Sequence, residues 1–178
     1  PVCQGSSIGL RVCRDDDDWA RAVASVGAMP MMAEPMLEPV REVAVGLVAR
    51  GEGPLSPVPI VEIAPSEAGG GLYDYKAKYE RDDTVYTVGP ELPDGVGERV
   101  AAWTRTVAHA LGVRHVCRAD FLVDDAGDAW FLEVNTMPGF TSHSLLPKAC
   151  AHAGVDMPAL CEGLVFRAWA DARARVVV

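Results

Sequence analysis

Hydrophobic and polar positions alternate most clearly in one stretch beyond the middle of the chain. Two runs rich in Phe, Leu, Val and Trp, residues 118–124 and 129–135, flank the polar sequence Asp-Asp-Ala-Gly-Asp. Apolar runs of this length around a turn-forming segment predict a β-hairpin. With the turn centred on Ala126-Gly127, Asp120 is predicted to lie opposite Glu133.

The period of two along a strand assigns the hairpin residues to two faces. One face collects the charged and amide side chains, Arg118, Asp120, Glu133 and Asn135. Leu122 and Phe131 are expected to flank the carboxylates and to keep water partly away. The other face is predicted to pack into the core, and it carries Phe121, Val123, Trp130, Leu132 and Val134.

The remaining pattern predicts an α+β fold. Helices are predicted from the acidic residues 15–18 to about residue 26, over 94–111 and over 158–175. On the second of these, a helical stripe is predicted to face the core: Val96, Val100, Trp103, Val107 and Leu111. Strands are predicted over 8–12, 29–34, 41–50 and 58–63, and the three glycines 69–71 predict a loop.

Three oxygen donors on rigid strands suit a hard cation. Asp120, Glu133 and Asn135 offer carboxylate and amide oxygens, which Mg²⁺ prefers, and no His or Cys occupies a matching position. A divalent cation would also relieve the repulsion between two partly dry carboxylates. The alternative is a surface hairpin with solvated charges.

The segment after the hairpin predicts an anion-binding helix start. Residues 135–139, Asn-Thr-Met-Pro-Gly, leave the strand as a tight loop, and Ser142 or Ser144 can cap the helix that follows. Unbonded N–H groups at such a start attract carboxylates and phosphates. Arg118 beside a metal site suits the stabilisation of charge on a phosphoryl or tetrahedral transition state. Its alternative role is a salt bridge to Glu133.

Composition narrows the class of partner. The 178 residues include 16 Lys and Arg and 25 Asp and Glu, a net charge of −9, which argues against nucleic acid or an anionic membrane as the main partner. Neither a signal-peptide pattern nor an apolar run of about 18 residues is present, so a cytoplasmic location is expected. Five cysteines without zinc-site spacing are interpreted as reduced, structural thiols.

Three blocks of the chain resemble D-alanine–D-alanine ligases, the ATP-grasp enzymes of peptidoglycan precursor synthesis. Residues 1–9 are similar to the family's Gly-Ser-Ser loop, and residues 74–79 to its Tyr-Asp-Tyr-x-x-Lys-Tyr segment. Residues 118–147, with Arg-Ala-Asp, Glu-Val-Asn-Thr-Met-Pro-Gly and Ser-His-Ser-Leu-Leu-Pro, resemble its C-terminal signature. The blocks occur in the family's order.

The resemblance implies an ATP-grasp fold with an antiparallel sheet flanked by helices. Residues 1–37 would form the end of the central lobe with the Gly-Ser-Ser loop, and residues 38–178 the C-terminal catalytic lobe. The N-terminal substrate domain would be absent, so that the fragment alone is expected to be inactive. The full-length protein would be a homodimer that joins two D-alanines through an acyl phosphate, with ATP and two Mg²⁺ or Mn²⁺ ions as cofactors.

The resemblance also implies roles for single residues. Asp120, Glu133 and Asn135 would hold the metal ions that bridge the ATP phosphates. The tetrahedral intermediate would be stabilised by Arg118 and the Gly139 N–H. The second D-alanine's carboxylate would be bound by Ser144 and the Leu145 N–H. Lys78, Ser6 and Ser7 would contact the ATP phosphates, and Tyr79 would help to hold the closed loop. Glu34 to Leu37 would contact the adenine, and Glu42 would bind the ribose.

The chain departs from the family pattern at a few positions. His115 and Cys117 stand where small residues are usual, Lys76 stands where glutamate is common, and the adenine linker is one residue longer. Two alternatives remain at this point: a D-alanine–D-lactate or D-alanine–D-serine ligase, and a non-catalytic nucleotide-binding module. Tyr79 favours the dipeptide product.

Overall fold

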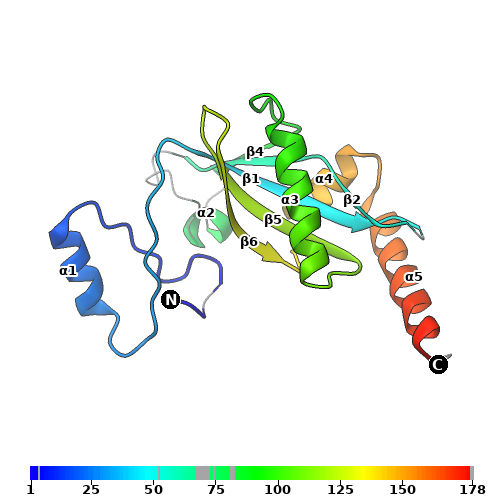
Figure 1. The fold of residues 1–178 in the computed structure, drawn as a ribbon, viewed down its shortest axis with the longest axis horizontal. Coiled ribbons are helices and arrows are strands. Elements are labelled where there is room, and N and C mark those ends of the chain that lie inside the picture. Colours follow the sequence, from blue (N-terminus) through cyan, green and yellow to red (C-terminus); the bar gives the residue numbers. More distant parts are fainter. Residues whose placement is uncertain (4, 52, 67–72, 74, 81–82, 177–178) are drawn as a thin grey trace. The chain divides into compact units, whose positions relative to one another are not determined.

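A computed structural model describes residues 1–176 except 4, 52, 67–72, 74 and 81–82, and it leaves the side chains of residues 76, 79, 175 and 176 undescribed (Figure 1). The loop predicted at 69–71 lies outside the described residues. The chain divides into two compact units, residues 1–38 with 64–85, and residues 39–63 with 86–178.

In the described part of the first unit there are two helices, α1 (Asp16–Ser25) and the short α2 (Tyr75–Tyr79). The predicted start of α1 is confirmed, because Asp15 is the N-cap and its carboxylate accepts a hydrogen bond from Asp18 N at 2.7 Å. The strands predicted over 8–12 and 29–34 are wrong. Neither segment has a strand partner within the described residues, and an unpaired segment cannot form a ladder.

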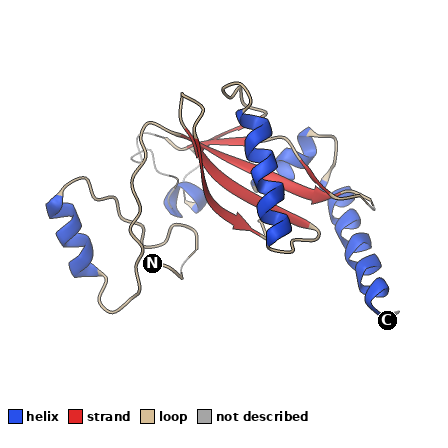
Figure 2. Cartoon of the chain, viewed as in Figure 1, coloured by secondary structure: helices blue, strands red, loops and turns tan. Residues whose placement is uncertain are grey.

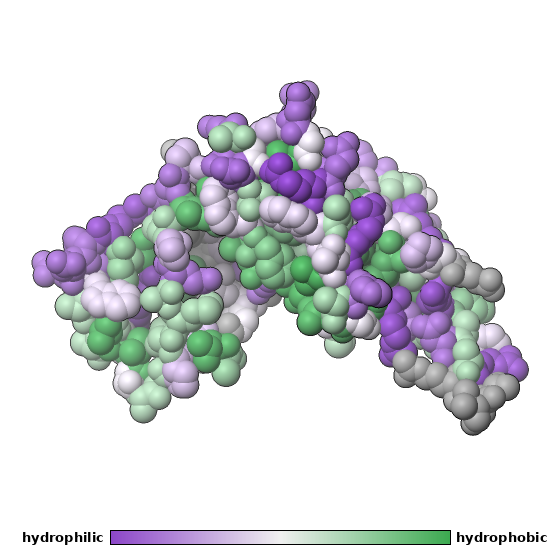
Figure 3. All heavy atoms as spheres, viewed as in Figure 1, coloured by the Kyte–Doolittle hydropathy of each residue, from purple (hydrophilic) through white to green (hydrophobic). Residues whose placement is uncertain are grey.

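Apolar side chains of the first unit lie largely on its surface. Helix α1 has no buried residue, and within the described part of this unit Ala77 alone is a buried hydrophobic residue. Figure 3 shows hydrophobic atoms, drawn in green, on the surface of this region at the left. The exposed side chains include Leu10, Trp19, Val23, Met29 and Met32.

The second unit is an α+β fold around an antiparallel sheet, as predicted (Figure 2). The strands run in the order β4-β3-β1-β5-β6, and β2 pairs with the far end of β1. Their bounds are β1 Arg41–Ala49, β2 Leu55–Pro57, β3 Val61–Ala64, β4 Val85–Val88, β5 Val116–Val123 and β6 Ala129–Asn135. The helices are α3 (Val96–Ala110), α4 (Leu145–His152) and α5 (Met157–Val176). Among the described residues, no helix combines the length and apolar character needed to cross a membrane.

The predicted strand over 58–63 is only partly right, because residues 58–60 lie outside any strand and β3 covers Val61–Ala64. A separate short strand, β2, precedes this break. Strand β2 pairs with the end of β1 through Val48↔Ser56, and β3 pairs with its beginning through Val43↔Glu62. Three prolines between 54 and 59 explain the break, because proline cannot donate to a ladder.

Helix α3 covers one face of the sheet, here called the core face. Its buried residues are Val96, Val100, Ala101, Thr104 and Ala108, so the predicted stripe is only partly right. Trp103 and Leu111 are 40% and 62% exposed. Thr104 can replace an apolar residue in the stripe because its hydroxyl donates to Val100 O at 2.7 Å. The sheet contributes Val43, Val45, Ala119, Phe121 and Val123 to this core.

Helix α4 packs on the opposite face, here called the site face. Gly46 of β1 lies opposite Arg118, and a Cβ atom at this position would collide with Leu146 on α4 and with Val58. The missing side chain therefore lets the first turn of α4 lie directly over the sheet.

The hairpin of β5 and β6 has the predicted register near the site and a different one near the turn. Asp120 pairs with Glu133 as predicted, but a β-bulge follows and Phe121 pairs with Phe131. The extra residue, Leu132, exchanges the faces of the rest of β6. Phe131, predicted beside the carboxylates, instead packs edge-on against Phe121 with ring centroids 5.6 Å apart. Trp130 and Leu132, predicted as core, are 37% and 45% exposed.

Candidate functional site

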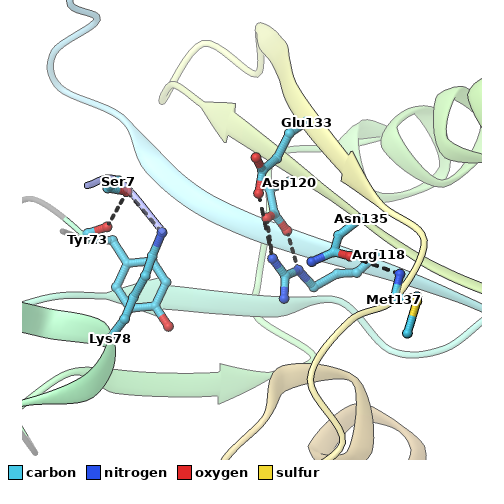
Figure 4. A network of polar contacts seen from close by, with 8 residues as sticks. All are labelled: Ser7, Tyr73, Lys78, Arg118, Asp120, Glu133, Asn135 and Met137. Carbon is cyan, nitrogen blue, oxygen red and sulfur yellow. Dashed lines mark hydrogen bonds and ion pairs between the residues drawn. The ribbon is translucent and has the colours of Figure 1, made fainter. Parts of the chain in front are cut away.

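Four predicted site residues come together on the site face of β5 and β6. Arg118 lies opposite Asn135, and Asp120 lies opposite Glu133. Because these pairs are two residues apart on each strand, all four side chains project from the same face. Figure 4 shows them gathered in one polar cluster.

Arg118 and Asp120 form a bidentate ion pair. Arg118 Nε donates to Asp120 Oδ1 at 2.8 Å, and Nη2 donates to Oδ2 at 2.7 Å. Glu133 Oε1 lies farther from the same Nη2, at 3.9 Å. The Asp120 side chain is 8% exposed, whereas that of Glu133 is 63% exposed. The tight partner of Arg118 is therefore the buried carboxylate, and the predicted bridge to Glu133 is a secondary contact.

The donor chemistry of this cluster fits a hard divalent cation. Asn135 Oδ1 accepts a hydrogen bond from Met137 N at 2.9 Å, which fixes the amide at the end of β6. Within the described residues, no group of three or more His, Cys, Asp and Glu side chains has metal-binding geometry. A cation here would depend on two carboxylates and one amide oxygen, which is an oxygen set suited to Mg²⁺.

The loop that follows β6 leads back to the beginning of α4. Ser144 is the N-cap residue of α4, as predicted, but its hydroxyl makes no capping hydrogen bond to the helix. Ser144 Oγ instead accepts from Thr141 N at 3.1 Å and lies 2.9 Å from Thr141 Oγ1. Gly139 packs so closely on Ser144 that a Cβ atom would collide with Oγ. The hydroxyl thus shapes the loop and leaves the first-turn N–H groups, including that of Leu145, to other acceptors.

The helix start lies close to the arginine. Leu146, in the first turn of α4, packs over Gly46, and Gly46 is the strand neighbour of Arg118. The beginning of α4, with the partial positive charge of a helix N-terminus, therefore lies over the strand position next to Arg118, on the same face of the sheet.

A second polar group lies in the first unit. Lys78 Nζ donates to Ser7 Oγ at 3.0 Å, and Ser7 Oγ donates to Tyr73 O at 3.3 Å (Figure 4). The Lys78 ammonium also lies 4.8 Å from the centre of the Tyr73 ring. Ser6 and Ser7 both have φ of 57°, an uncommon conformation for serine, so this loop has a specific shape. The structure therefore joins two of the predicted phosphate-binding residues, Ser7 and Lys78.

The other predicted nucleotide residues are more scattered. Glu34 and Leu37 belong to an irregular segment of the first unit, and Glu34 is exposed. Glu42 lies on β1 opposite Leu122, which places it on the site face. The side chain of Tyr79 lies outside the described residues.

Of the residues that depart from the family pattern near Arg118, Cys117 lies on the core face and His115 contacts α5. Cys117 is fully buried with Leu47 and Ala108 on the core face, and burial raises the pKa of its thiol to about 11. His115 Nε2 lies 2.9 Å from Asp171 Oδ2 on α5, and this hydrogen bond lowers the pKa of the Asp171 carboxyl. Of the five free cysteines, Cys117 and Cys150 are buried, whereas Cys3 and Cys161 are exposed, so the predicted structural role fits only part of the set.

Sequence reasoning missed three residues that shape the site. Thr141 has a signal in the sequence, because its spacing of three from Ser144 is typical of hydroxyl-capped turns. The signal for Tyr73 in the sequence is only its position next to the segment that contains Lys78. Gly46 has no such signal, since the residue that packs closely on a glycine within a strand is known only from the three-dimensional structure.

Comparison with known proteins establishes the family. A sequence model described as D-ala D-ala ligase C-terminus matches residues 1–166. The chain belongs to this family. The family's D-alanine–D-alanine ligase from Acinetobacter baylyi is 36% identical over 163 residues, which are 90% of this chain and 50% of that protein. The one from Gluconobacter oxydans is 34% identical over 174 residues, covering 96% and 55%. The chain thus spans about half the length of the curated relatives it matches.

Solved structures of D-alanine–D-alanine ligases share the fold. The crystal structure of the Bacillus anthracis enzyme complexed with ATP superposes with a TM-score of 0.60 at 26% identity, over 78% of this chain and 41% of that one. The Coxiella burnetii enzyme gives a TM-score of 0.71 at 21% identity, over 92% and 42%. The predicted ATP-grasp fold is therefore confirmed.

Proposed function

We propose that this chain forms one side of the active site of an ATP-dependent D-alanine–D-alanine ligase, which makes the dipeptide for peptidoglycan precursors. The observation that carries this proposal is the polar cluster on β5 and β6 beside the beginning of α4. It combines oxygen donors for a metal, a guanidinium and helix N–H groups on one face. In the proposed reaction, a D-alanine carboxylate attacks the γ-phosphate of ATP, and a second D-alanine's amine displaces phosphate from the acyl phosphate.

The metal-binding and anion-binding residues have separate roles in this proposal. Asp120, Glu133 and Asn135 would hold two Mg²⁺ or Mn²⁺ ions, which neutralise charge on the ATP phosphates. Arg118 and the Gly139 N–H would stabilise the oxyanion of the tetrahedral intermediate. The N–H groups at the beginning of α4, with Ser144 and Leu145, would bind the carboxylate of the second D-alanine.

The nucleotide residues are proposed from the family relationship and from the loop geometry. Lys78, Ser6 and Ser7 would contact the ATP phosphates, and Tyr79 would hold the loop closed. Glu34 to Leu37 would contact the adenine, and Glu42 the ribose hydroxyls. The hydrogen bond from Lys78 to Ser7 supports the phosphate site, because it holds a cation beside the Gly-Ser-Ser loop.

The cellular context is also a proposal. We place the ligase in the cytoplasm as a homodimer whose partners are D-alanine and nucleotide rather than nucleic acid or membrane. The net charge of −9 supports the exclusion of polyanionic partners.

Arg118→Ala tests this function directly. In the complete ligase, with this chain joined to the remaining half that its relatives carry, we expect turnover to fall by ~10²-fold or more, the effect of losing a transition-state donor. Arg105→Ala, on the exposed face of α3, is the matched control and should keep normal turnover. Near-normal turnover of Arg118→Ala would refute the role. Product analysis with D-alanine, D-lactate and D-serine as second substrates would identify the ligase type.

A further inference from the structure

The ion pair between Arg118 and Asp120 occupies the oxygens that a metal would use. Both Asp120 oxygens accept hydrogen bonds from the guanidinium, at 2.7 and 2.8 Å. The Asp120 side chain is 8% exposed and that of Arg118 is 18% exposed, so little solvent reaches the pair. An Asp120 carboxylate bound in this way has both oxygens directed at the arginine rather than at the proposed metal position.

Arg118 has a second, looser contact, with the other carboxylate of the proposed metal site. Its Nη2 lies 3.9 Å from Glu133 Oε1, which is 63% exposed and directly across the hairpin from Asp120. The guanidinium therefore lies between a buried carboxylate that holds it tightly and an exposed one that holds it loosely. On the same face, the beginning of α4 offers a nearby place for an anion.

We propose that Arg118 is a placeholder for the divalent cation, and that metal binding releases it from Asp120. This inference rests on the proposed function, since it assumes that Asp120 binds the metal. Without metal, the guanidinium neutralises a carboxylate whose burial alone would be costly. The arriving cation takes over that neutralisation, and the repulsion between two neighbouring positive charges displaces the guanidinium.

The exchange couples two parts of the site. Arg118 can reach the reacting anion only after the Asp120 carboxylate has exchanged the guanidinium for the metal as its partner. Before that, Asp120 holds the guanidinium away from substrate. The order of events thus follows from one side chain having two mutually exclusive partners.

The wild-type chain can be tested without any substitution. In a Mg²⁺ titration followed by NMR, we expect the Arg118 Nε–H resonance to lose its ion-paired shift in step with changes at the Glu133 and Asn135 amides. If those amides respond while the Arg118 resonance keeps its shift, metal binds without releasing the pair and the placeholder role is wrong. If neither amide responds, the metal site itself fails, and with it the part of the proposed function on which this inference rests.

Metal affinity provides the second test. We expect Arg118→Gln to bind Mn²⁺ roughly tenfold more tightly than the wild type, measured by electron paramagnetic resonance of free Mn²⁺, because a competing cation is removed. Arg118→Lys retains the charge without the bidentate fork and should fall between the two. Arg105→Gln, the control on α3, should match the wild type. Unchanged or weaker binding by a folded Arg118→Gln chain would overturn the proposal.

Discussion

Gly46 shows at the scale of a single residue how packing positions the site. Because Gly46 has no side chain, α4 can pack closely against the sheet at the strand position beside Arg118. We expect Gly46→Ala to lower the free energy of unfolding by about 1–3 kcal/mol, the usual cost of overpacking a close contact. Urea denaturation measures this change.

Gly163→Ala is the matched control for that prediction. Gly163 lies in α5, and a Cβ atom there would meet nothing within 4 Å. Alanine in the interior of a helix should therefore stabilise the chain, by about 0.4–1 kcal/mol. Equal effects of the two substitutions would contradict the packing of α4 on Gly46.

The common face of the four candidate site residues could be predicted from the sequence, but the carboxylate that the arginine prefers could not. Residue type and the period of two place Arg118, Asp120, Glu133 and Asn135 on one face of a hairpin, and the structure agrees. Which carboxylate the arginine prefers depends on burial, because the buried Asp120 is poorly solvated and needs the closer partner. The sequence carries no direct signal for that difference.

At the scale of elements, Arg41 and Glu62 tie β3 to β1. Arg41 Nε and Nη2 donate to the two Glu62 oxygens at 2.6 and 2.8 Å. These hydrogen bonds lower the pKa of the Glu62 carboxyl from its ordinary value of 4.5. A carboxyl with a lower pKa in the folded state binds fewer protons there, so its stabilisation is complete above pH 4.5 and is lost as the pH falls through the folded pKa.

Glu62→Gln should therefore make the free energy of unfolding depend less on pH in the acid range. The variant is expected to lose stability at neutral pH, and the difference from the wild type should shrink as the pH falls below 4.5. Urea denaturation across that range measures both. Glu98→Gln, on exposed α3 surface, should leave the profile unchanged. A difference between Glu62→Gln and wild type that does not vary with pH would contradict the ion pair.

The elements show where periodicity is a sufficient guide and where it is not. The amphipathic pattern over 94–111 predicted α3 close to its observed bounds, whereas α1 was predicted from its acidic N-terminal residues and α5 from its Arg-rich end. The prediction of which β6 side chains face the core was wrong beyond the bulge, because one extra residue, Leu132, reverses the two faces of the strand there. The strands predicted over 8–12 and 29–34 were wrong because strand formation depends on a partner, which no local pattern specifies.

At the scale of the whole molecule, the chemistry is divided between two compact units. The proposed phosphate-binding residues Ser7 and Lys78 belong to the first, and the proposed metal and oxyanion residues belong to the second. The resemblance of three separated blocks predicted the family from the sequence, because the family's motifs occur along the chain in a recognisable order. The family match over residues 1–166 agrees with that prediction.

Whether Asp120, Glu133 and Asn135 form a divalent metal site can be measured with Mn²⁺ bound to this chain. Paramagnetic broadening of the backbone amide signals of this chain should be strongest around residues 118–120 and 133–135 and should spare Val100 on the core face. Glu133→Gln should reduce it. Broadening centred on the acidic residues 15–18, or spread evenly over the chain, would contradict the site.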